Sequence, residues 1–438
     1  MGFNILMLAD FRKRSANTII DHVTSFKKYS RNRLFFVDPL ARDKPAWLNM
    51  NRFDIVVLHY SIYILGENYI NATWRDAIST CKAVKIQFLQ DEYRNINAFH
   101  QRMTELGIQV LFTCVPDKEI EKVYPSDKLK GLVKINNLTG YVPEYYERKK
   151  PDFSMKHRPI DVGYRGRGFG GLFWFGELFQ EKVWIGEHFL QHVKDHGLRC
   201  DISSREEDRI YGKNWLHFLK NCKCILGTES GASVFDFTGE IEKNVSDYCS
   251  KNPQATFGEV KKLFFKDIDG LIRLNQISPR AFEAIGCGTC QILYEGNYSG
   301  ILNPDVHFIE LKKDFSNIEE VVARIRDDNY LNKLAERAYN DIIASGKYSY
   351  RSFIQLFDDK VDQYMTKFPA SSGSIKLIHL GQSRWMFIYR CAKSVIRYLY
   401  NRMISMMKAV YYRLRLRRAH PFFKREKLRL LSFLMKGS

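Results

Sequence analysis

Short apolar runs alternate with helical patterns twice along this 438-residue chain. The first series of apolar runs occupies 3–9, 34–37, 55–59, 84–89 and 110–114. Each run has the length of a buried strand, and the stretches between them are polar or helix-like. Strands that alternate with helices form βαβ units, whose strands are parallel and whose sheet is covered on both faces. The chain is therefore expected to begin with an α/β domain.

A second series follows 149–159, a polar and basic stretch with two prolines that we interpret as a linker. Strands are expected at 160–164, 224–227, 291–294 and 306–311, and helices at 181–196, 215–221, 318–345 and 348–365. Residues 241–266 are interpreted as a helical insertion. The predicted units are an N-terminal Rossmann-like domain (1–145), a second Rossmann-like domain (146–345), a closing helix (346–368) and a tail (369–438).

Between the insertion and the strand at 291–294, the segment Ser278–Thr289 combines an acid in an apolar helix with two glycines that end the helix. The acid is Glu283, and Gly286 and Gly288 precede Thr289. A helix N-terminus offers unpaired N–H groups and a positive dipole end, which favour phosphate. Glu283 is expected to accept hydrogen bonds from a ribose. The alternative is a first-turn glutamate that the dipole stabilises.

The segment Ser278–Thr289 resembles the C-terminal signature of the glycosyltransferase group 1 superfamily. The second domain is most similar to the spore-maturation-type branch of that superfamily. The resemblance covers about residues 1–365. It implies the GT-B fold, in which two Rossmann-like domains face a cleft, and the transfer of a sugar from a nucleoside-diphosphate donor. It also implies that the enzyme uses neither a catalytic metal nor a cofactor.

The resemblance suggests side chains that neutralise the donor diphosphate. Gly166-Arg167 is similar to the Gly-Arg of the superfamily, and Lys182 is similar to the lysine of its Glu-Lys-Gly motif. Arg165 precedes them, and Arg280 either contacts phosphate or pairs with the helix glutamate. Arginine binds phosphate through two hydrogen bonds, whereas lysine acts as a point charge. The alternative is a glycine-rich surface loop with solvated cations.

The two acids of the superfamily motif are altered in this chain. Asn275 stands where the first acid is expected, counted back from Glu283. A second interpretation assigns the first acid to Glu229, so that the insertion at 241–266 splits the motif. Glu229 is then expected near the donor sugar. The alternative for Glu229 is a turn carboxylate that caps the next segment. Because the motif is altered, both a retaining and an inverting reaction stay open.

The first domain carries candidate acceptor residues where its strands end. Arg14, Ser15 and Asn17 follow the first strand and are expected to contact the acceptor. Asp91 and Glu92 follow the strand at 84–89, and either is a candidate acceptor base. The alternative to a catalytic role is that Asp91 caps the following helix and Glu92 is an acid at its start.

His22 lies in Asp21-His22-Val23, which resembles the helix that follows the first loop in the superfamily. It is either a catalytic base or a helix residue at an interface. The nine cysteines form no metal-site spacing and are expected to be reduced thiols in a cytosolic protein. No metal site is therefore expected.

The tail carries most of the positive charge. Residues 369–438 contain sixteen lysines and arginines and one acid, Glu426, so they contribute +15 of the net charge of +19. Apolar residues recur every three or four positions and basic residues flank them, as in a helix that lies on anionic lipid. Docking on a protein surface and nucleic-acid binding are the alternatives. We expect a peripheral protein on the cytoplasmic face of the cell membrane that does not bind nucleic acid.

Together these features predict a glycosyltransferase that acts on a saccharide acceptor. The acceptor is expected to be linked to a polyprenyl-diphosphate lipid, as in the synthesis of lipopolysaccharide and other surface polysaccharides. The rival hypothesis is a non-catalytic GT-B scaffold that binds membranes or protein partners through its tail.

Overall fold

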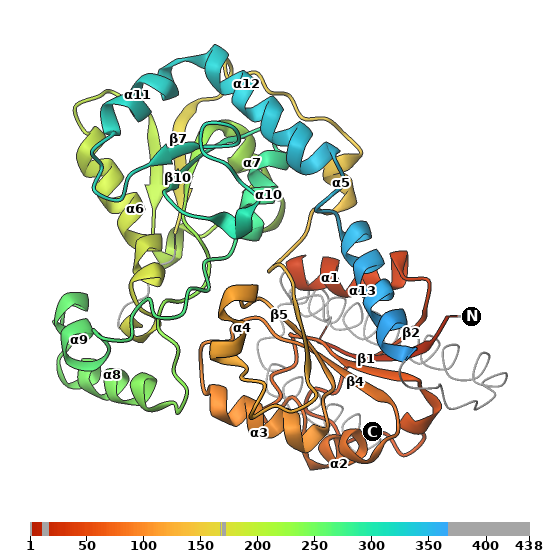
Figure 1. Cartoon of the computed structure of the whole chain (residues 1–438). Coiled ribbons are helices and arrows are strands. Elements are labelled where there is room, and N and C mark those ends of the chain that lie inside the picture. Colours follow the sequence, from red (N-terminus) through yellow and green to blue (C-terminus); the bar gives the residue numbers. More distant parts are fainter. Residues whose placement is uncertain (1, 11–16, 167, 169–171, 367–438) are drawn as a thin grey trace, which may run out of the picture. The chain divides into compact units, whose positions relative to one another are not determined.

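Two all-parallel sheets organise the protein (Figure 1). The computed structural model describes residues 2–10, 17–166, 168 and 172–366, and these form one compact unit. The predicted α/β class with two parallel sheets is confirmed. Arg14, Ser15, Arg167 and the tail lie outside the described residues, so the predictions for them stay predictions. We call the parts built on the two sheets the first and second domains.

The first sheet has six strands in the order β2-β1-β3-β4-β5-β6. The strands are β1 (Asn4–Leu8), β2 (Arg33–Val37), β3 (Ile55–Leu58), β4 (Val84–Phe88), β5 (Val110–Thr113) and β6 (Val133–Asn136). The helices are α1 (Asn17–Tyr29), α2 (Ala72–Thr80), α3 (Ile96–Leu106) and α4 (Asp117–Val123). Strands β3 and β4 are buried along their whole length because helices cover both faces of a parallel sheet.

The second sheet has five strands in the order β11-β10-β9-β7-β8. The strands are β7 (Ile160–Arg165), β8 (Cys200–Ser203), β9 (Cys222–Gly227), β10 (Cys290–Tyr294) and β11 (Ile309–Leu311). The helices of this domain are α5 (Glu144–Glu147), α6 (Glu177–Val193), α7 (Gly212–Asn221), α10 (Pro279–Gly286), α11 (Ile318–Arg326), α12 (Asp328–Ala338) and a π-helix (Tyr339–Ala344). Short 3-10 helices lie at Met50–Arg52, Phe173–Phe175, Glu206–Asp208 and Tyr298–Gly300.

The helix predicted at 318–345 is divided at Asp327. The side chain of Asp327 accepts a hydrogen bond from the Tyr330 amide and so begins α12 as a new helix. A carboxylate at this position caps a helix more readily than it continues one.

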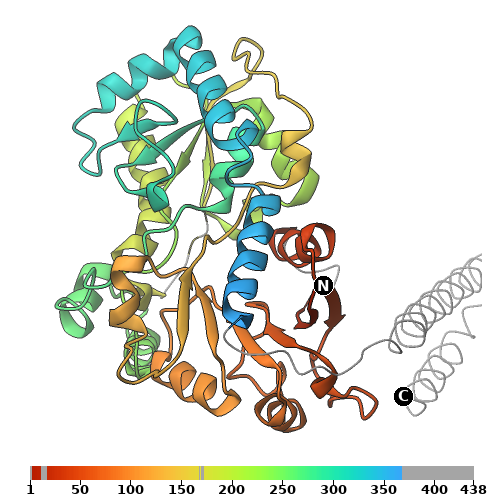
Figure 2. The same ribbon diagram turned by 45° about the vertical axis from the view of Figure 1, so that its right-hand side comes forward.

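The last described helix, α13 (Tyr350–Met365), packs on the first domain rather than on the second (Figures 1 and 2). Its buried face contributes Phe353 and Phe357 to the cluster that contains Phe26 of α1. Buried Asp358 accepts hydrogen bonds from the Ser30 hydroxyl and the Arg31 amide at 2.7 and 2.8 Å. The chain therefore leaves the first domain, builds the second and returns to the first.

The predicted insertion forms α8 (Glu240–Lys251) and α9 (Phe257–Phe264), and hydrogen bonds join the residues just before it to the first domain. The Asp236 amide donates to the Tyr93 carbonyl at 2.9 Å, and the Asn97 amide donates to the Phe237 carbonyl at 3.0 Å. Two side chains of the insertion, Val245 and Val260, belong to the same buried cluster as Tyr93. The insertion therefore connects the two domains at a second place, away from the linker.

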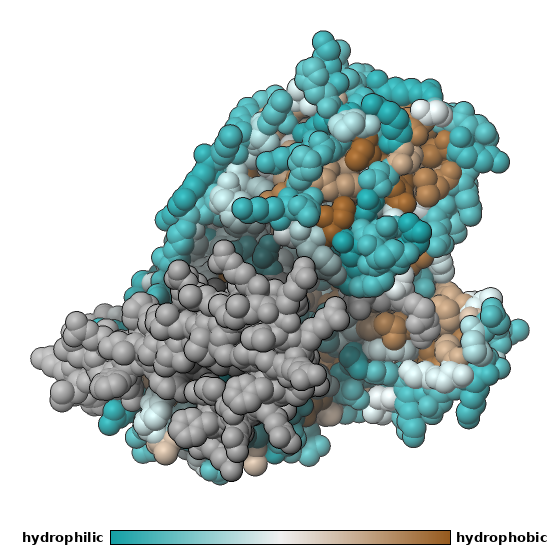
Figure 3. All heavy atoms as spheres, turned by 180° about the vertical axis from the view of Figure 1, so that it is seen from behind, coloured by the Kyte–Doolittle hydropathy of each residue, from teal (hydrophilic) through white to brown (hydrophobic). Residues whose placement is uncertain are grey.

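Apolar side chains also reach the surface of the second domain, as Figure 3 shows from behind. Leu263, in α9, and Leu271, after the insertion, are 57% and 60% exposed. Tyr211, just before α7, is 64% exposed. None of the helices in the described part of the chain is both long and apolar enough to cross a membrane.

Candidate functional site

A cavity of about 240 Å³ lies at the carboxyl-end side of the second sheet. Its walls come from β7, β9 and β10, from α6 and α7, and from the first turn of α10. Among its lining residues are three cations, Lys182, Arg209 and Arg280, and the indole of Trp215. Ligands of parallel α/β sheets bind at this edge. We call the cavity the cationic pocket.

Lys182 enters the cationic pocket from α6. Its ammonium lies 4.5 Å from the centroid of the Phe179 ring and forms no ion pair with any described residue. Burial lowers the pKa of Lys182 to about 8, although the nearby Asp91 carboxylate acts in the opposite direction. An unpaired and desolvated ammonium is unfavourable unless an anion binds to it. The pocket is therefore suited to an anionic ligand.

The N-terminus of α10 forms another wall of the cationic pocket. The Ser278 side chain caps the helix, and Pro279 occupies its first turn, where the missing N–H costs no hydrogen bond. Arg280 follows; its Nη1 donates to the Arg165 carbonyl at 2.7 Å, and its guanidinium lies 5.3 Å from the Trp215 ring centroid. Two cations and a helix N-terminus are the groups from which phosphate-binding sites are commonly built, and here they line one pocket.

Glu283 lies one turn further along α10, and its partner is an indole rather than Arg280. Trp215 Nε1 donates to Glu283 Oε2 at 2.7 Å. Burial raises the pKa of Glu283, and the Trp215 hydrogen bond and the charge of Arg280 partly offset this effect. Trp215 therefore connects Glu283 to the cationic pocket, which Trp215 lines and Glu283 does not. Trp215 was not predicted from the sequence, because a single tryptophan in a helix carries no distinctive signal.

Glu229 and Asn275, which the two interpretations of the altered motif singled out, are hydrogen-bonded to each other. Asn275 Nδ2 donates to Glu229 Oε2 at 2.6 Å. Glu229 Oε1 accepts from the amides of Asn297 and Tyr298 at 2.8 Å each. Glu229 lines the cationic pocket, but its carboxylate holds the loop after β10. The geometry therefore favours a supporting role for Glu229 over direct contact with a sugar.

Arg165 is engaged by the neighbouring strand. Its Nη2 donates to Asp201 Oδ1 at 2.8 Å, and its Nη1 donates to the Asp201 carbonyl at 2.9 Å. The guanidinium packs 4.5 Å from the centroid of the Phe218 ring. Arg165 is not among the residues that line the cationic pocket. Its contacts therefore favour a structural role over the predicted phosphate contact.

Gly286, Gly288 and Thr289 lie at the opposite end of α10 from the pocket, about 10 Å along the helix. A Cβ on Gly286 would be 2.3 Å from the Tyr146 ring, so the glycine lets this ring pack on the helix. Gly288 has a φ of +68°, which a residue with a Cβ rarely adopts. The Thr289 hydroxyl donates to the Leu219 carbonyl at 2.7 Å. The contacts of these three residues fix the packing of α10, and their role in donor binding stays a prediction.

The first domain contains a second cavity, of about 390 Å³, where β3 and β4 end. We call it the tyrosine pocket. It is lined by Tyr60, Ser61, Ile62, Tyr63, Tyr69, Leu89, Gln90, Asp91, Glu92, Arg94, Ile96, Phe99 and Tyr124. The two predicted base candidates that follow β4, Asp91 and Glu92, therefore lie in one pocket.

The two acids of the tyrosine pocket differ in their surroundings. Glu92 is buried and accepts hydrogen bonds from the Thr113 hydroxyl at 2.5 Å, from the Cys114 amide at 2.7 Å and from the Tyr124 hydroxyl. Its burial raises its pKa to about 7. Asp91 is exposed and accepts a hydrogen bond from the Tyr93 hydroxyl at 3.2 Å. Asp91 is therefore available to a ligand, whereas Glu92 holds the loop after β4.

His22 is buried and belongs to a chain of hydrogen bonds. The Ser61 amide donates to His59 Nδ1 at 3.0 Å, so His59 carries its proton on Nε2 and donates to His22 Nδ1 at 2.9 Å. His22 then carries its proton on Nε2, which has no described partner. Burial lowers the pKa of His22 to about 3. A neutral ring with neither nitrogen free to accept a proton cannot serve as a base in this arrangement.

Asn17 is exposed at the first position of α1, next to residues outside the described part. Among the described residues, no group of three or more histidine, cysteine or acidic side chains is arranged to hold a metal ion. The cysteines in this part of the chain are free thiols. Independence from metal stays a prediction.

No protein-family model matches the chain, and no curated protein matches it. Similar solved structures include Anabaena Alr3699/HepE in complex with UDP (TM-score 0.45, 10% identity, 83% of this chain and 100% of that chain). An alpha-glucosyltransferase in complex with UDP and an HMU-containing DNA is similar over 83% of this chain and 99% of its own (TM-score 0.46, 12% identity). TarM is similar over 70% of this chain and 54% of its own (TM-score 0.40, 10% identity). At these identities the likeness is one of fold.

Proposed function

We propose that the protein is a glycosyltransferase that moves a sugar from a nucleoside-diphosphate donor to a saccharide acceptor. The observation that carries this proposal is the cationic pocket, where Lys182, Arg280 and the N-terminus of α10 converge. Such a site suits a diphosphate. The resemblance of Ser278–Thr289 to the group 1 glycosyltransferase signature supports the same donor class and the GT-B architecture. The spore-maturation-type branch is proposed on sequence resemblance alone.

In the proposed reaction, an acceptor hydroxyl forms a bond to the anomeric carbon of the donor sugar. The bond from that carbon to the diphosphate breaks, and negative charge develops on the leaving group. Lys182 and Arg280 stabilise this charge because they are fixed in place before the reaction begins. The hydroxyl proton passes to a carboxylate, for which Asp91 is the accessible candidate. Glu283 remains the candidate for the ribose hydroxyls.

Binding of UDP, GDP, dTDP and CDP to the full-length protein tests this proposal. We expect one of them to bind by calorimetry, and we expect Lys182→Met to abolish most of the binding. Lys333→Met is the matched control, because Lys333 is an exposed lysine on α12, away from both pockets. If none of the four binds, or if both variants lose binding equally, the proposal fails.

A non-catalytic scaffold is the second candidate, and one observation favours it. Arg165, Glu229 and Glu283, all expected at the donor site, hydrogen-bond to other protein groups. A scaffold that retains the fold without the reaction predicts no nucleotide-dependent turnover. Detection of released nucleoside diphosphate in the presence of a donor and an acceptor therefore separates the two candidates.

The acceptor is proposed to be lipid-linked and to serve in surface polysaccharide synthesis on the cytoplasmic face of the membrane. This part rests on the charge and apolar pattern of residues 369–438, which the structure does not describe. A basic amphipathic helix binds anionic lipid more strongly than neutral lipid. Sedimentation with vesicles of phosphatidylglycerol, but not of phosphatidylcholine alone, is the expected result. Equal partition to both kinds of vesicle would contradict it.

A further inference from the structure

We propose that the tyrosine pocket binds one sugar ring of the acceptor and that it selects uncharged and amino sugars over sugar acids. This inference rests on the proposed function and adds the acceptor class. It is carried by the aromatic wall of the pocket and by the balance of charge around it.

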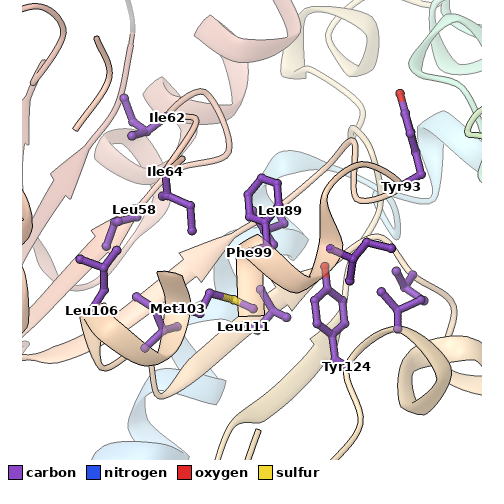
Figure 4. Packing of buried hydrophobic residues seen from close by; sticks show 14 of the residues in the cluster. Leu58, Ile62, Ile64, Leu89, Tyr93, Phe99, Met103, Leu106, Leu111 and Tyr124 are labelled. Atoms are coloured by element: carbon purple, nitrogen blue, oxygen red, sulfur yellow. The ribbon is translucent and has the colours of Figure 1, made fainter. Parts of the chain in front are cut away.

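The pocket has the size and the composition of a small-ligand site. Its volume of about 390 Å³ lies within the range of such sites, which is about 300–1,000 Å³. Its apolar base is part of the core of the first domain, where Leu89 and Phe99 pack beside Met103 (Figure 4). A rigid apolar base with polar groups at the rim fixes the orientation of a ligand.

Three aromatic rings form one wall. Tyr63 packs edge-on against Tyr69 and Phe99, with ring centroids 6.2 and 5.6 Å apart and interplanar angles of 74°. Tyr63 is 38% exposed, so part of its ring is accessible to a ligand. An aromatic ring is apolar over its face, and the C–H groups on one side of a pyranose pack against such a face. The Tyr63 hydroxyl can also form hydrogen bonds with the sugar hydroxyls.

Gly66 lies beside the aromatic wall and leaves space for two of its rings. A Cβ on Gly66 would be 3.0 Å from the Tyr69 ring and 3.1 Å from the Tyr63 ring. Any larger residue at this position would move one of the two rings. Gly66 therefore sets the spacing of the aromatic wall.

The charges around the pocket favour a ligand without negative charge. Glu242 neutralises Arg94, because Arg94 Nε donates to Glu242 Oε2 at 3.0 Å and the Nη2 group pairs with the second oxygen. The Arg94 guanidinium also lies over the Trp174 ring, at 5.1 Å from its centroid. Asp91 is exposed, and Glu92, whose pKa is about 7, carries part of a negative charge at neutral pH. A carboxylate brought into this pocket would face acids, and the one cation among its described lining residues, Arg94, is already paired with Glu242.

Asp91 also relates the tyrosine pocket to the cationic pocket. Its charge is close enough to raise the pKa of Lys182 against the effect of burial. Under the proposal, a sugar bound beside Asp91 is therefore near the lysine assigned to the donor diphosphate. An acceptor requires this arrangement, whereas an unrelated ligand does not.

The test uses the full-length protein and methyl glycosides of gluco, galacto and manno configuration, each as the neutral sugar, the 2-amino sugar and the 6-carboxylate. Saturation-transfer NMR titrations report the affinity for each probe. We expect at least one configuration to bind as the neutral sugar and the amino sugar. We expect the matching 6-carboxylate to bind at least about tenfold more weakly.

Two substitutions localise the binding. Tyr63→Ala is expected to weaken sugar binding by about tenfold, whereas Tyr63→Phe retains the ring and most of the affinity. Asp91→Asn is expected to weaken binding of the amino sugar and to reduce the discrimination against the 6-carboxylate. Tyr211→Ala, which removes an exposed tyrosine that lines neither pocket, is the matched control.

Binding of the 6-carboxylate as tight as that of the neutral sugar would overturn the inference. So would unchanged binding in Tyr63→Ala, or no binding of any probe. Nucleoside-diphosphate titrations on the same samples keep this inference separate from the proposed function. Nucleotide binding without sugar selection overturns only the inference, whereas sugar binding without nucleotide binding overturns the proposed donor site.

Discussion

The two pockets occupy equivalent places in the two sheets, yet they offer opposite chemistry. Each lies where parallel strands end, so the same topology creates both. The cationic pocket presents Lys182, Arg280 and a helix N-terminus, whereas the tyrosine pocket presents aromatic rings and Asp91. The fold thus determines where a ligand binds, and the side chains on it determine which ligand binds.

A second contrast lies within α10. Its N-terminal turn lines the cationic pocket, whereas its C-terminal end packs on residues that precede the second sheet. One short helix therefore combines a ligand-binding end with a structural end. The four predictions below test the ligand-binding and structural assignments. They run from the largest expected effect on nucleotide affinity to the smallest.

Lys182→Met should cause the largest loss, about 100-fold in the affinity for the nucleoside diphosphate. A charge-assisted hydrogen bond from a desolvated ammonium contributes about 1.5–3 kcal/mol, and the removed charge also stabilised the second phosphate. Calorimetry measures the loss. A change of less than threefold would mean that the diphosphate does not bind at Lys182.

Stability provides a control for this variant. The pKa of Lys182 is about 8 in the folded protein and 10.5 as its ordinary value, so the unfolded chain binds the proton more strongly. The wild type should therefore gain stability as pH rises from about 8 to about 10.5, whereas Lys182→Met should not. Urea unfolding at pH 7 should show the variant to be at least as stable as the wild type.

Arg280→Gln should weaken nucleotide binding by about tenfold. Arg280 is exposed, and water compensates for part of its charge, so it contributes less than the enclosed Lys182. Calorimetry on the single and double variants shows whether the two losses add. A larger loss in Arg280→Gln than in Lys182→Met would reverse the assigned order of the two cations.

The affinity for the nucleotide should fall by about fourfold between pH 7 and 8.5, because Lys182 loses its proton with a pKa of about 8. The charge of the phosphates is nearly constant over this range, since their last proton dissociates near pH 6. Titrations at several pH values should show this fall in the wild type and a flat profile in Lys182→Met. A flat profile in the wild type would contradict the assigned pKa.

Gly286→Ala should leave nucleotide affinity unchanged but lower the free energy of unfolding by about 1–3 kcal/mol. The added Cβ would lie 2.3 Å from the Tyr146 ring and force it to move. Thermal unfolding and calorimetry on the same variant test both parts. A loss of affinity without a loss of stability would return Gly286 to the donor site.

The sequence was sufficient to predict the buried strands and α10, because uninterrupted apolar runs and a glycine-terminated helix carry strong signals. It did not reveal β6 and β8, which are edge strands of their sheets with half-exposed residues. Because β8 was not predicted, Arg165 was expected to contact phosphate. Its partner Asp201 lies on that strand, so the ion pair was invisible without the strand pairing.

The candidate site, like the fold, was predicted only in part. Lys182 and Arg280 line one cavity, and Asp91 lines the other. The family resemblance indicated Lys182, whereas Arg280 and Asp91 were indicated by their positions at a helix start and after a strand. Glu229 and Asn275, the residues of the two interpretations of the altered motif, are hydrogen-bonded to each other. They lie side by side because their neighbours Ser230 and Gln276 exchange two backbone hydrogen bonds. The pairing of Trp215 with Glu283 depends on packing between α7 and α10, which no local pattern reports.

A crossed binding experiment tests the division between the two pockets most directly. The nucleoside diphosphate and the neutral methyl glycoside are each titrated into wild type, Lys182→Met and Tyr63→Ala. Each variant should lose only its own ligand: Lys182→Met the nucleotide, and Tyr63→Ala the sugar. Loss of both ligands in both variants, or loss of the opposite ligand in either, would contradict the assignment of an anion site to the second domain and a sugar site to the first.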